Sequence, residues 1–438
     1  MSRPFQELFN ALSNEESKPS AEPRDVSRTV EHLFRHESVK MVATLTGIFG
    51  IEHLALAEDV VQEALARALQ TWPYHGLPEN PAAWIMRTSR NLALDVVRRE
   101  KRFRDKEPEI IRIIEDDQPA TAAASGEEIS DDRLRMMFVC CHPKVPADAQ
   151  SVLALKTLCG FGIAEIARAF LSSEAAVAKR LTRAKQSIRD AKIPFEIPAG
   201  PELAQRMEGV LRSLYFLFNE GYKASAGDRL VREDICLEAI RLTGLLAEHP
   251  IGNGPRTHAL MALMLLNAAR LPARMDDEGN LLRMREQDRT KWDGAMIARG
   301  MFHLAQSAAG DELSEYHLQA GIAACHCSAR DYASTDWAKI LALYDRLVAF
   351  DPSPVAALNR AVAVAEVHGP QAGIDAVNAI PDLKSLGSFY LLHAVLGDFE
   401  WQLNRLPIAA AHFQKALELA NMKSEQAFLS KRLRDCGG

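Results

Sequence analysis

"NPAAWIMRTSRNLALDVVRRE", residues 80–100, reads as one amphipathic helix whose two sides carry different chemistry. At about 100° per residue, a sector of roughly 80° collects Trp84, Arg87, Asn91, Asp95, Arg98 and Arg102. The opposite side is apolar and contains Ile85, Leu92, Ala93, Val96 and Val97. We expect the apolar side to be buried. The polar side suits a ligand with flat stacked rings and phosphate groups. For this stripe taken alone, a solvated amphipathic helix with no ligand is the favoured explanation.

The composition indicates a soluble, almost entirely helical protein. The 438 residues are too many for one core, and 47% apolar with 25% charged residues is ordinary for a globular chain. The net charge of −6 means that any nucleic-acid site must be local. The amino terminus lacks the apolar segment of a signal peptide, and residues 258–271 are too short a run to span a membrane. We therefore expect a cytoplasmic protein with reduced thiols among its seven cysteines.

Neither a metal site nor an enzyme is predicted. Two Cys/His groups, Cys140 to His142 and Cys325 to Cys327, lack C-x-x-C spacing, and adjacent residues on a helix point about 100° apart. The sequence has no H-E-x-x-H motif, no nucleophile–base pattern and no glycine-rich phosphate loop. We expect buried thiols, no cofactor and no catalysis.

The chain divides by composition into segments of an all-α protein. They are a polar tail (1–25), three helices (26–106), an acidic flexible linker (107–133), a compact helical unit (134–192), a proline-bearing linker (193–202) and a helical extension (203–438). The linker holds nine acidic residues against two arginines. In the extension, residues 369–377 and 406–417 resemble each other at an offset of about 37, near the TPR period. An α-solenoid-like, TPR-like domain is predicted, although generic helical-hairpin packing would give a similar pattern.

A second basic unit, "GIAEIARAFLSSEAAVAKRLTRAKQSIR" (162–189), has the form of a helix-turn-helix. Ser172 or Ser173 is placed to cap its second helix. The outer face of that helix presents Ser173, Glu174, Lys179, Arg180 and Arg183. Such a helix reads base edges with its amino-terminal end and holds phosphates with later cations. A structural hairpin with a basic solvated face is the alternative.

Three segments together resemble a bacterial sigma factor of the extracytoplasmic-function (ECF) class: "AEDVVQEAL" (57–65), "WIMRTSRNLALDVVRRE" (84–100) and residues 162–189. The resemblance implies that the first segment binds the clamp helices of core RNA polymerase through Asp59, Gln62, Glu63 and Leu65. It implies that the second meets the −10 promoter element, with the loop 73–80, through Trp84, Arg87, Asn91, Asp95, Arg98 and Arg99. The helix-turn-helix would read the −35 element through Ser173, Glu174, Lys179, Arg180 and Arg183. The acidic linker would cross the polymerase, or serve as a plain spacer.

The extension resembles that of a sigma subgroup described as TPR-like and thought to regulate the factor. Five of its residues would line a concave surface for a protein or small-molecule partner, or else form hydrogen bonds inside the domain: Trp292, Asp336, Trp337, Asn359 and Arg360. A competing hypothesis is a promoter-specific helix-turn-helix regulator with a helical sensory domain. That hypothesis leaves residues 57–65 and 84–100 without a role.

Overall fold

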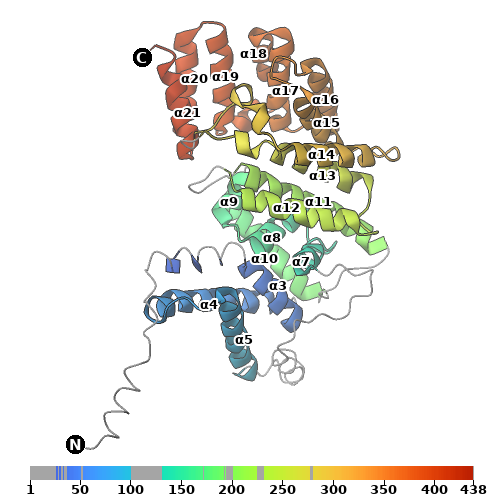
Figure 1. Cartoon of the computed structure of the whole chain (residues 1–438), viewed down its shortest axis with the longest axis vertical. Coiled ribbons are helices and arrows are strands. Elements are labelled where there is room, and N and C mark those ends of the chain that lie inside the picture. The colour runs from blue at the N-terminus through green and yellow to red at the C-terminus, as the bar shows by residue number, and fades with distance from the viewer. Residues whose placement is uncertain are drawn as a thin grey trace, which may run out of the picture. The chain divides into compact units, whose positions relative to one another are not determined.

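The computed structural model describes residues 26–27, 29–30, 33, 37–50, 53–99, 131–170, 172–191, 193, 201–223, 231–276 and 280–437. All regular structure in these ranges is helical, apart from an isolated antiparallel bridge between Met275 and Leu281 (Figure 1). The predicted all-α class is therefore confirmed. The predicted polar tail (1–25), and the acidic linker as far as residue 130, lie outside the described residues. The chain forms two compact units, Met1–Ser213 and Leu214–Gly438.

Three helices open the first unit: α3 (Ser38–Phe49), α4 (Leu54–His75) and α5 (Pro81–Arg99). Helix α4 packs against both of the others, and its inward side is a ridge of small and branched apolar residues that ends at Trp72, 2% exposed. Asn80 caps α5, because its Oδ1 accepts the backbone N–H of Ala83 at 3.0 Å. The ridge and the cap fix which side of α5 faces solvent.

Four shorter helices follow: α7 (Asp132–Cys140), α8 (Ala147–Cys159), α9 (Ile163–Ala169) and α10 (Glu174–Ala191). The Asp131 carboxylate accepts the backbone N–H groups of Arg133 and Leu134 and so caps α7. Residues 131–133, predicted as the end of the linker, are therefore the start of this helical unit. Helix α8 ends at Gly160, whose φ of 65° is left-handed.

Helix α11 (Pro201–Tyr222) contains the division between the two units. Its first half belongs to the first unit, where the Arg206 guanidinium donates to the Phe138 carbonyl oxygen at 3.4 Å. Ser213 Oγ lies 3.8 Å from Cys141 Sγ. The sequence predicts that the extension begins at residue 203, but the structural division falls at 213/214 because these contacts tie residues 201–213 to α7 and α8.

The second unit is a series of helices, each packed on its neighbours in the sequence. They are α12 (Glu233–Glu248), α13 (Pro255–Ala268), α14 (Gly294–Ser307), α15 (Glu315–Ser328), α16 (Trp337–Phe350), α17 (Pro354–His368), α18 (Pro370–Asn378), α19 (Tyr390–Gln402), α20 (Leu406–Leu419) and α21 (Lys423–Arg434). Short 3₁₀ turns lie between some of them: η3 (Leu271–Ala273), η4 (Met284–Glu286), η5 (Arg289–Lys291) and η6 (Leu383–Leu386). No described helix is long and apolar enough to cross a membrane.

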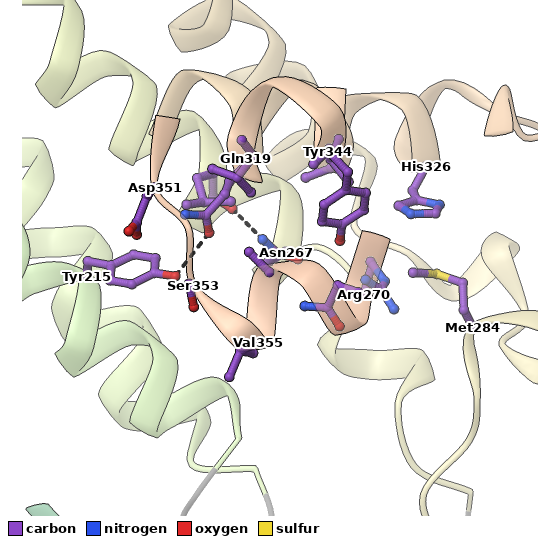
Figure 2. A pocket seen from close by; sticks show the side chains of 16 residues that line it. Tyr215, Asn267, Arg270, Met284, Gln319, His326, Tyr344, Asp351, Ser353 and Val355 are labelled. Atoms are coloured by element: carbon purple, nitrogen blue, oxygen red, sulfur yellow. Dashed lines mark hydrogen bonds between the residues drawn. The ribbon is translucent and has the colours of Figure 1, made fainter. Parts of the chain in front are cut away.

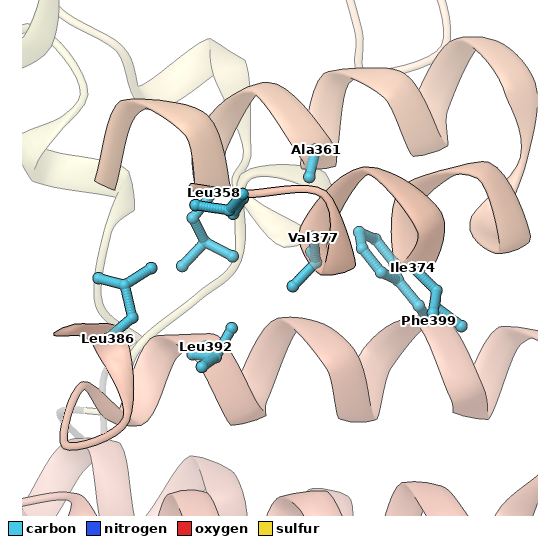
Figure 3. Packing of buried hydrophobic residues seen from close by; sticks show 8 residues of the cluster. Leu358, Ala361, Ile374, Val377, Leu386, Leu392 and Phe399 are labelled. Carbon is cyan, nitrogen blue, oxygen red and sulfur yellow. The ribbon is translucent and has the colours of Figure 1, made fainter. Parts of the chain in front are cut away.

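The repeated sequence in the extension forms the second helices of two consecutive hairpins, α17/α18 and α19/α20. Figure 3 shows the core of the first hairpin between α17, α18 and α19, where Ile374 and Phe399 lie together at one end and Leu358 lies nearer Leu392 at the other. Gly373 permits this approach, since a Cβ atom there would lie 2.7 Å from Ala365 Cβ. The packing is that of a solenoid, in which each hairpin buries its neighbour's apolar face.

Candidate polymerase and nucleic-acid interface

The predicted polar stripe of α5 faces solvent. Arg87, Asn91, Asp95 and Arg98 are exposed, whereas Ile85 is fully buried on the other side. The side chain of Arg99 and the whole of Arg102 lie outside the described residues. The described stripe therefore offers two guanidinium groups and one amide on adjacent turns, with a carboxylate between them. This arrangement fits a phosphate backbone with an unpaired base alongside it.

Trp84 differs from the rest of the stripe because it is half-buried. Its ring meets the ring of buried Trp72 edge-on, with the centroids 5.3 Å apart. Such a pair contributes about 0.5–1.5 kcal/mol beyond its buried area. The geometry supports a packing role for Trp84 in joining α5 to α4.

A more exposed aromatic ring lies beside the start of α5. Tyr74, near the end of α4, is 81% exposed. It falls within the loop 73–80, which the sequence associates with the separating strand, although Tyr74 itself was not predicted as a site residue. Its isolation among polar neighbours in "PYHGLPENP" is the signal that could have identified it. An exposed ring at this position can stack on a base.

Helix α4 presents Asp59, Gln62 and Glu63 to solvent, as predicted. Glu63 Oε1 pairs with Arg67 Nε at 2.9 Å on the same face. Leu65, predicted as the apolar anchor for a partner, is only 5% exposed and packs inside the bundle instead. At about 100° per residue, Leu65 points roughly 120° away from Asp59, whereas Leu69 falls beside Gln62. Leu69 is 47% exposed and is the apolar side chain that this face presents.

Helix α10 is held by an internal cap and an ion pair. Ser173 Oγ accepts the backbone N–H of Ala176 at 3.2 Å, so the predicted serine cap is confirmed. Ser173, Glu174 and Lys179 are exposed at the amino-terminal end of the helix. The guanidinium groups of Arg180 and Arg183 lie 3.1 Å and 3.9 Å from the Asp148 carboxylate of α8. Exposed pairs of this kind contribute little stability, so a stronger anion can displace the carboxylate.

The basic helix also contacts the acidic face of α4. Lys185 Nζ on α10 donates to Glu58 Oε2 at 2.8 Å. Glu58 is the sequence neighbour of Asp59, which belongs to the predicted polymerase-binding face. This ion pair therefore joins the two helices that carry the candidate interfaces, although neither Lys185 nor Glu58 was predicted as a site residue.

The predicted buried thiols are found in the first cysteine group, Cys140 and Cys141, whereas Cys325 and Cys327 of the second group are partly exposed. Burial raises the pKa of Cys141 to about 12, so this thiol stays protonated at neutral pH. Cys140 is also buried, and the neighbouring His142 accepts the Lys144 backbone N–H through Nδ1 at 3.1 Å. Among the described residues, no group of three or more His, Cys, Asp or Glu side chains is arranged to hold a metal ion.

The five residues singled out in the extension are separated by the fold. Asn359 lines a cavity, whereas Trp292 is buried. The Asp336 carboxylate caps α16 by accepting the Lys339 backbone N–H at 2.9 Å. Trp337 packs edge-on against His326, and Arg360 Nε donates to Asp345 at 2.6 Å. Trp292 and Trp337 pack against neighbouring side chains, whereas the hydrogen bonds of Asp336 and Arg360 lie at the exposed surface, so the five residues do not form one interior network.

Both helical groups of the first unit match known families. Residues 43–103 match sigma-70 region 2, and residues 135–188 match sigma-70 region 4. The chain therefore belongs to the sigma-70 family and is an RNA polymerase sigma factor. Residues 206–308 match a family of unknown function, DUF6596, which places a second family in the extension that follows region 4.

Two curated proteins are similar to the chain over different lengths. "Uncharacterized protein R00370" of Rhizobium meliloti (strain 1021) is 39% identical over 383 residues, which cover 87% of this chain and 90% of that protein. The "Probable RNA polymerase sigma factor RfaY" of Xanthomonas campestris pv. campestris is 27% identical over 139 residues, covering 31% of this chain and 34% of that protein. No solved structure matches the chain.

Proposed function

We propose that this sigma factor acts in the manner of the ECF class, in the cytoplasm, by attaching to core polymerase through α4. Asp59, Gln62 and Glu63 make polar contacts with the clamp helices, and Leu69 supplies the apolar contact. A helix that presents polar residues around one exposed leucine suits docking against a partner's helices. The support for this step is the exposure of all four side chains on neighbouring turns.

Promoter opening is assigned to α5, the loop before it and Tyr74 in the last turn of α4. Arg87 and Arg98 hold phosphates of the non-template strand, and Asn91 bonds a base edge. Tyr74 stacks on a base that has left the duplex. Captured single-stranded bases stabilise the open state, so no bond in the nucleic acid is made or broken. The exposed stripe of α5 is the single observation that carries this proposal.

The −35 element is read by α10 in this proposal. Ser173, Glu174 and Lys179 face the base edges at the amino-terminal end of the helix. Arg180 and Arg183 exchange the Asp148 carboxylate for DNA phosphates. The exchange is favoured because the contacts with Asp148 are partly exposed and contribute little. In addition, the release of counterions from DNA strengthens the arginine–phosphate contacts that replace them.

Run-off transcription with purified core polymerase tests the proposal. Tyr74→Ala is expected to reduce open-complex formation by about 5- to 100-fold, because base stacking contributes about 1–3 kcal/mol. Arg87→Ala should lower the salt dependence of promoter binding by about one unit of slope. Arg330→Ala is the matched control, since that arginine is exposed in the extension. Unchanged open complexes with both Tyr74→Ala and Arg87→Ala would refute the role of α5.

The competing regulator hypothesis is separated by its dependence on core enzyme. A sigma factor directs initiation only when bound to core polymerase, whereas a regulator binds its operator alone. We expect no specific footprint from the isolated protein and a −35/−10 footprint once core is added. A specific footprint without core would favour the regulator.

A further inference from the structure

The second unit contains a half-open cavity that the proposed function does not use. Its volume is about 320 Å³, and its walls come from α11, α13, α15, α16, the start of α17 and the loop before it (Figure 2). This volume lies at the lower end of the range for small-molecule sites, about 300–1,000 Å³. The size therefore suits a small organic molecule better than a folded partner or a long peptide.

One end of the cavity carries hydrogen-bond donors for an anion. The Arg270 guanidinium is held in place by Gln287 Oε1, 3.2 Å from Nη2, and by the Trp292 ring 5.4 Å away. No described residue accepts from Arg270 Nη1. A guanidinium fixed on one edge with its other nitrogen available is a ready partner for a carboxylate.

His326 lies at the same end of the cavity, as Figure 2 shows. It is 8% exposed, and its Nδ1 has no hydrogen-bond partner in the described structure. Burial and the charges of Arg270 and Arg289 lower the pKa of His326 to about 3, so the ring is neutral at pH 7. Because an unpaired buried polar atom costs free energy, this nitrogen is expected to bond a ligand or water when the cavity is filled.

The remainder of the cavity is mixed. Ile322, Leu347 and Val355 provide an apolar wall, and Tyr344 also lines the cavity. At the far end, the Tyr215 hydroxyl donates to Gln319 Oε1 at 3.0 Å, which leaves the Gln319 amide N–H groups available. A ligand with an apolar body and a polar substituent would match the apolar wall and the Gln319 amide at the far end of the cavity.

We propose that the extension binds a small organic monocarboxylate with an apolar body, its carboxylate on Arg270 and His326 and its body between α13, α15 and α16. The site uses residues of the second unit alone, so it goes beyond the promoter-binding function of the first. A free inorganic anion would leave the apolar walls empty, and an organic cation would meet Arg270.

The test uses the full-length protein and three probe acids: octanoate, 4-hydroxybenzoate and indole-3-propionate. Each is compared with its own primary amide, which keeps the shape and removes the charge. We expect at least one acid to raise the Tm and to bind in calorimetry at least tenfold more tightly than its amide. If no acid binds at millimolar concentration, or if the amides bind as tightly as the acids, the proposal is wrong.

Two variants locate the binding site. Arg270→Gln is expected to weaken the best acid at least tenfold, whereas Arg360→Gln, which removes a guanidinium outside the cavity, should leave the affinity unchanged. Ala356→Leu fills the cavity and should abolish binding of acid and amide alike, and it keeps the test informative if Arg270→Gln fails to fold by circular dichroism. Equal loss in Arg270→Gln and Arg360→Gln, or full affinity in Ala356→Leu, would overturn the assignment.

Discussion

At the scale of single residues, His326 in α15 links the stability of the extension to pH. Its pKa is lowered from 6.5 to about 3 by burial and by Arg270 and Arg289, while Trp337 packs against its ring. Because the folded pKa lies below the unfolded value, the neutral ring's contribution is complete above pH 6.5. It is lost at about 1.4 kcal/mol per pH unit as the pH falls toward 3. Urea unfolding between pH 7 and pH 5 should therefore show a shallower pH dependence in His326→Phe than in the wild type. His368→Gln, at an exposed histidine, should keep the wild-type slope, and equal slopes in all three proteins would contradict this account.

At the scale of elements, two leucines one turn apart on α4 have opposite roles. Leu65→Ala empties space inside the bundle and is expected to lower the free energy of unfolding by about 2–5 kcal/mol. Leu69→Ala removes an exposed side chain and should leave stability within about 0.5 kcal/mol of wild type. If α4 docks on the clamp helices, only Leu69→Ala weakens core binding in a folded protein. A Leu65→Ala variant as stable as the wild type would contradict the packing of Leu65 inside the bundle.

Helix α18 offers a second test of packing. Gly373→Ala would place a methyl group against Ala365 and Phe399, and overpacking of this kind costs about 1–3 kcal/mol. The same substitution at Gly294, at the start of α14, meets nothing within 4 Å. Because alanine favours helix over glycine by up to about 1 kcal/mol, Gly294→Ala should be neutral or stabilising. Thermal unfolding of both variants checks the difference in sign.

Periodicity within a single helix predicts much of the first unit and little of the second. The exposed and buried sides of α5 follow from the spacing of its own residues, as does the serine cap of α10. Leu65 was predicted wrongly although the spacing of α4 alone places it about 120° from Asp59 and brings Leu69 beside Gln62. The cavity could not be predicted for a different reason: Tyr215, His326 and Tyr344 belong to α11, α15 and α16, and Arg270 follows α13, so these residues come together only when the four helices pack. A sequence pattern indicates which residues are close along the chain, but not which distant residues the fold brings together.

At the scale of the whole molecule, the stability of a truncated chain depends on the residue at which it ends. A chain ending at residue 202 lacks Arg206 and Ser213, which contact Phe138 and Cys141 in the first unit. A chain ending at residue 213 keeps them. We expect residues 1–213 to fold and bind core polymerase, and residues 1–202 to be less stable by about 2 kcal/mol or more, with a Tm at least about 4 °C lower. Equal Tm values would mean that the first half of α11 adds nothing to region 4.

The contact between Lys185 and Glu58, 2.8 Å long, has a consequence for binding both promoter elements at once. The names of the −35 and −10 elements set them about 25 base pairs apart, which is roughly 85 Å along the duplex. If α10 and α5 occupy these elements together, the ion pair between Lys185 and Glu58 must break when the promoter complex assembles. Added salt weakens this ion pair, and it also lowers the affinity of the protein for DNA. Initiation should therefore pass through an optimum of ionic strength instead of declining steadily from low salt.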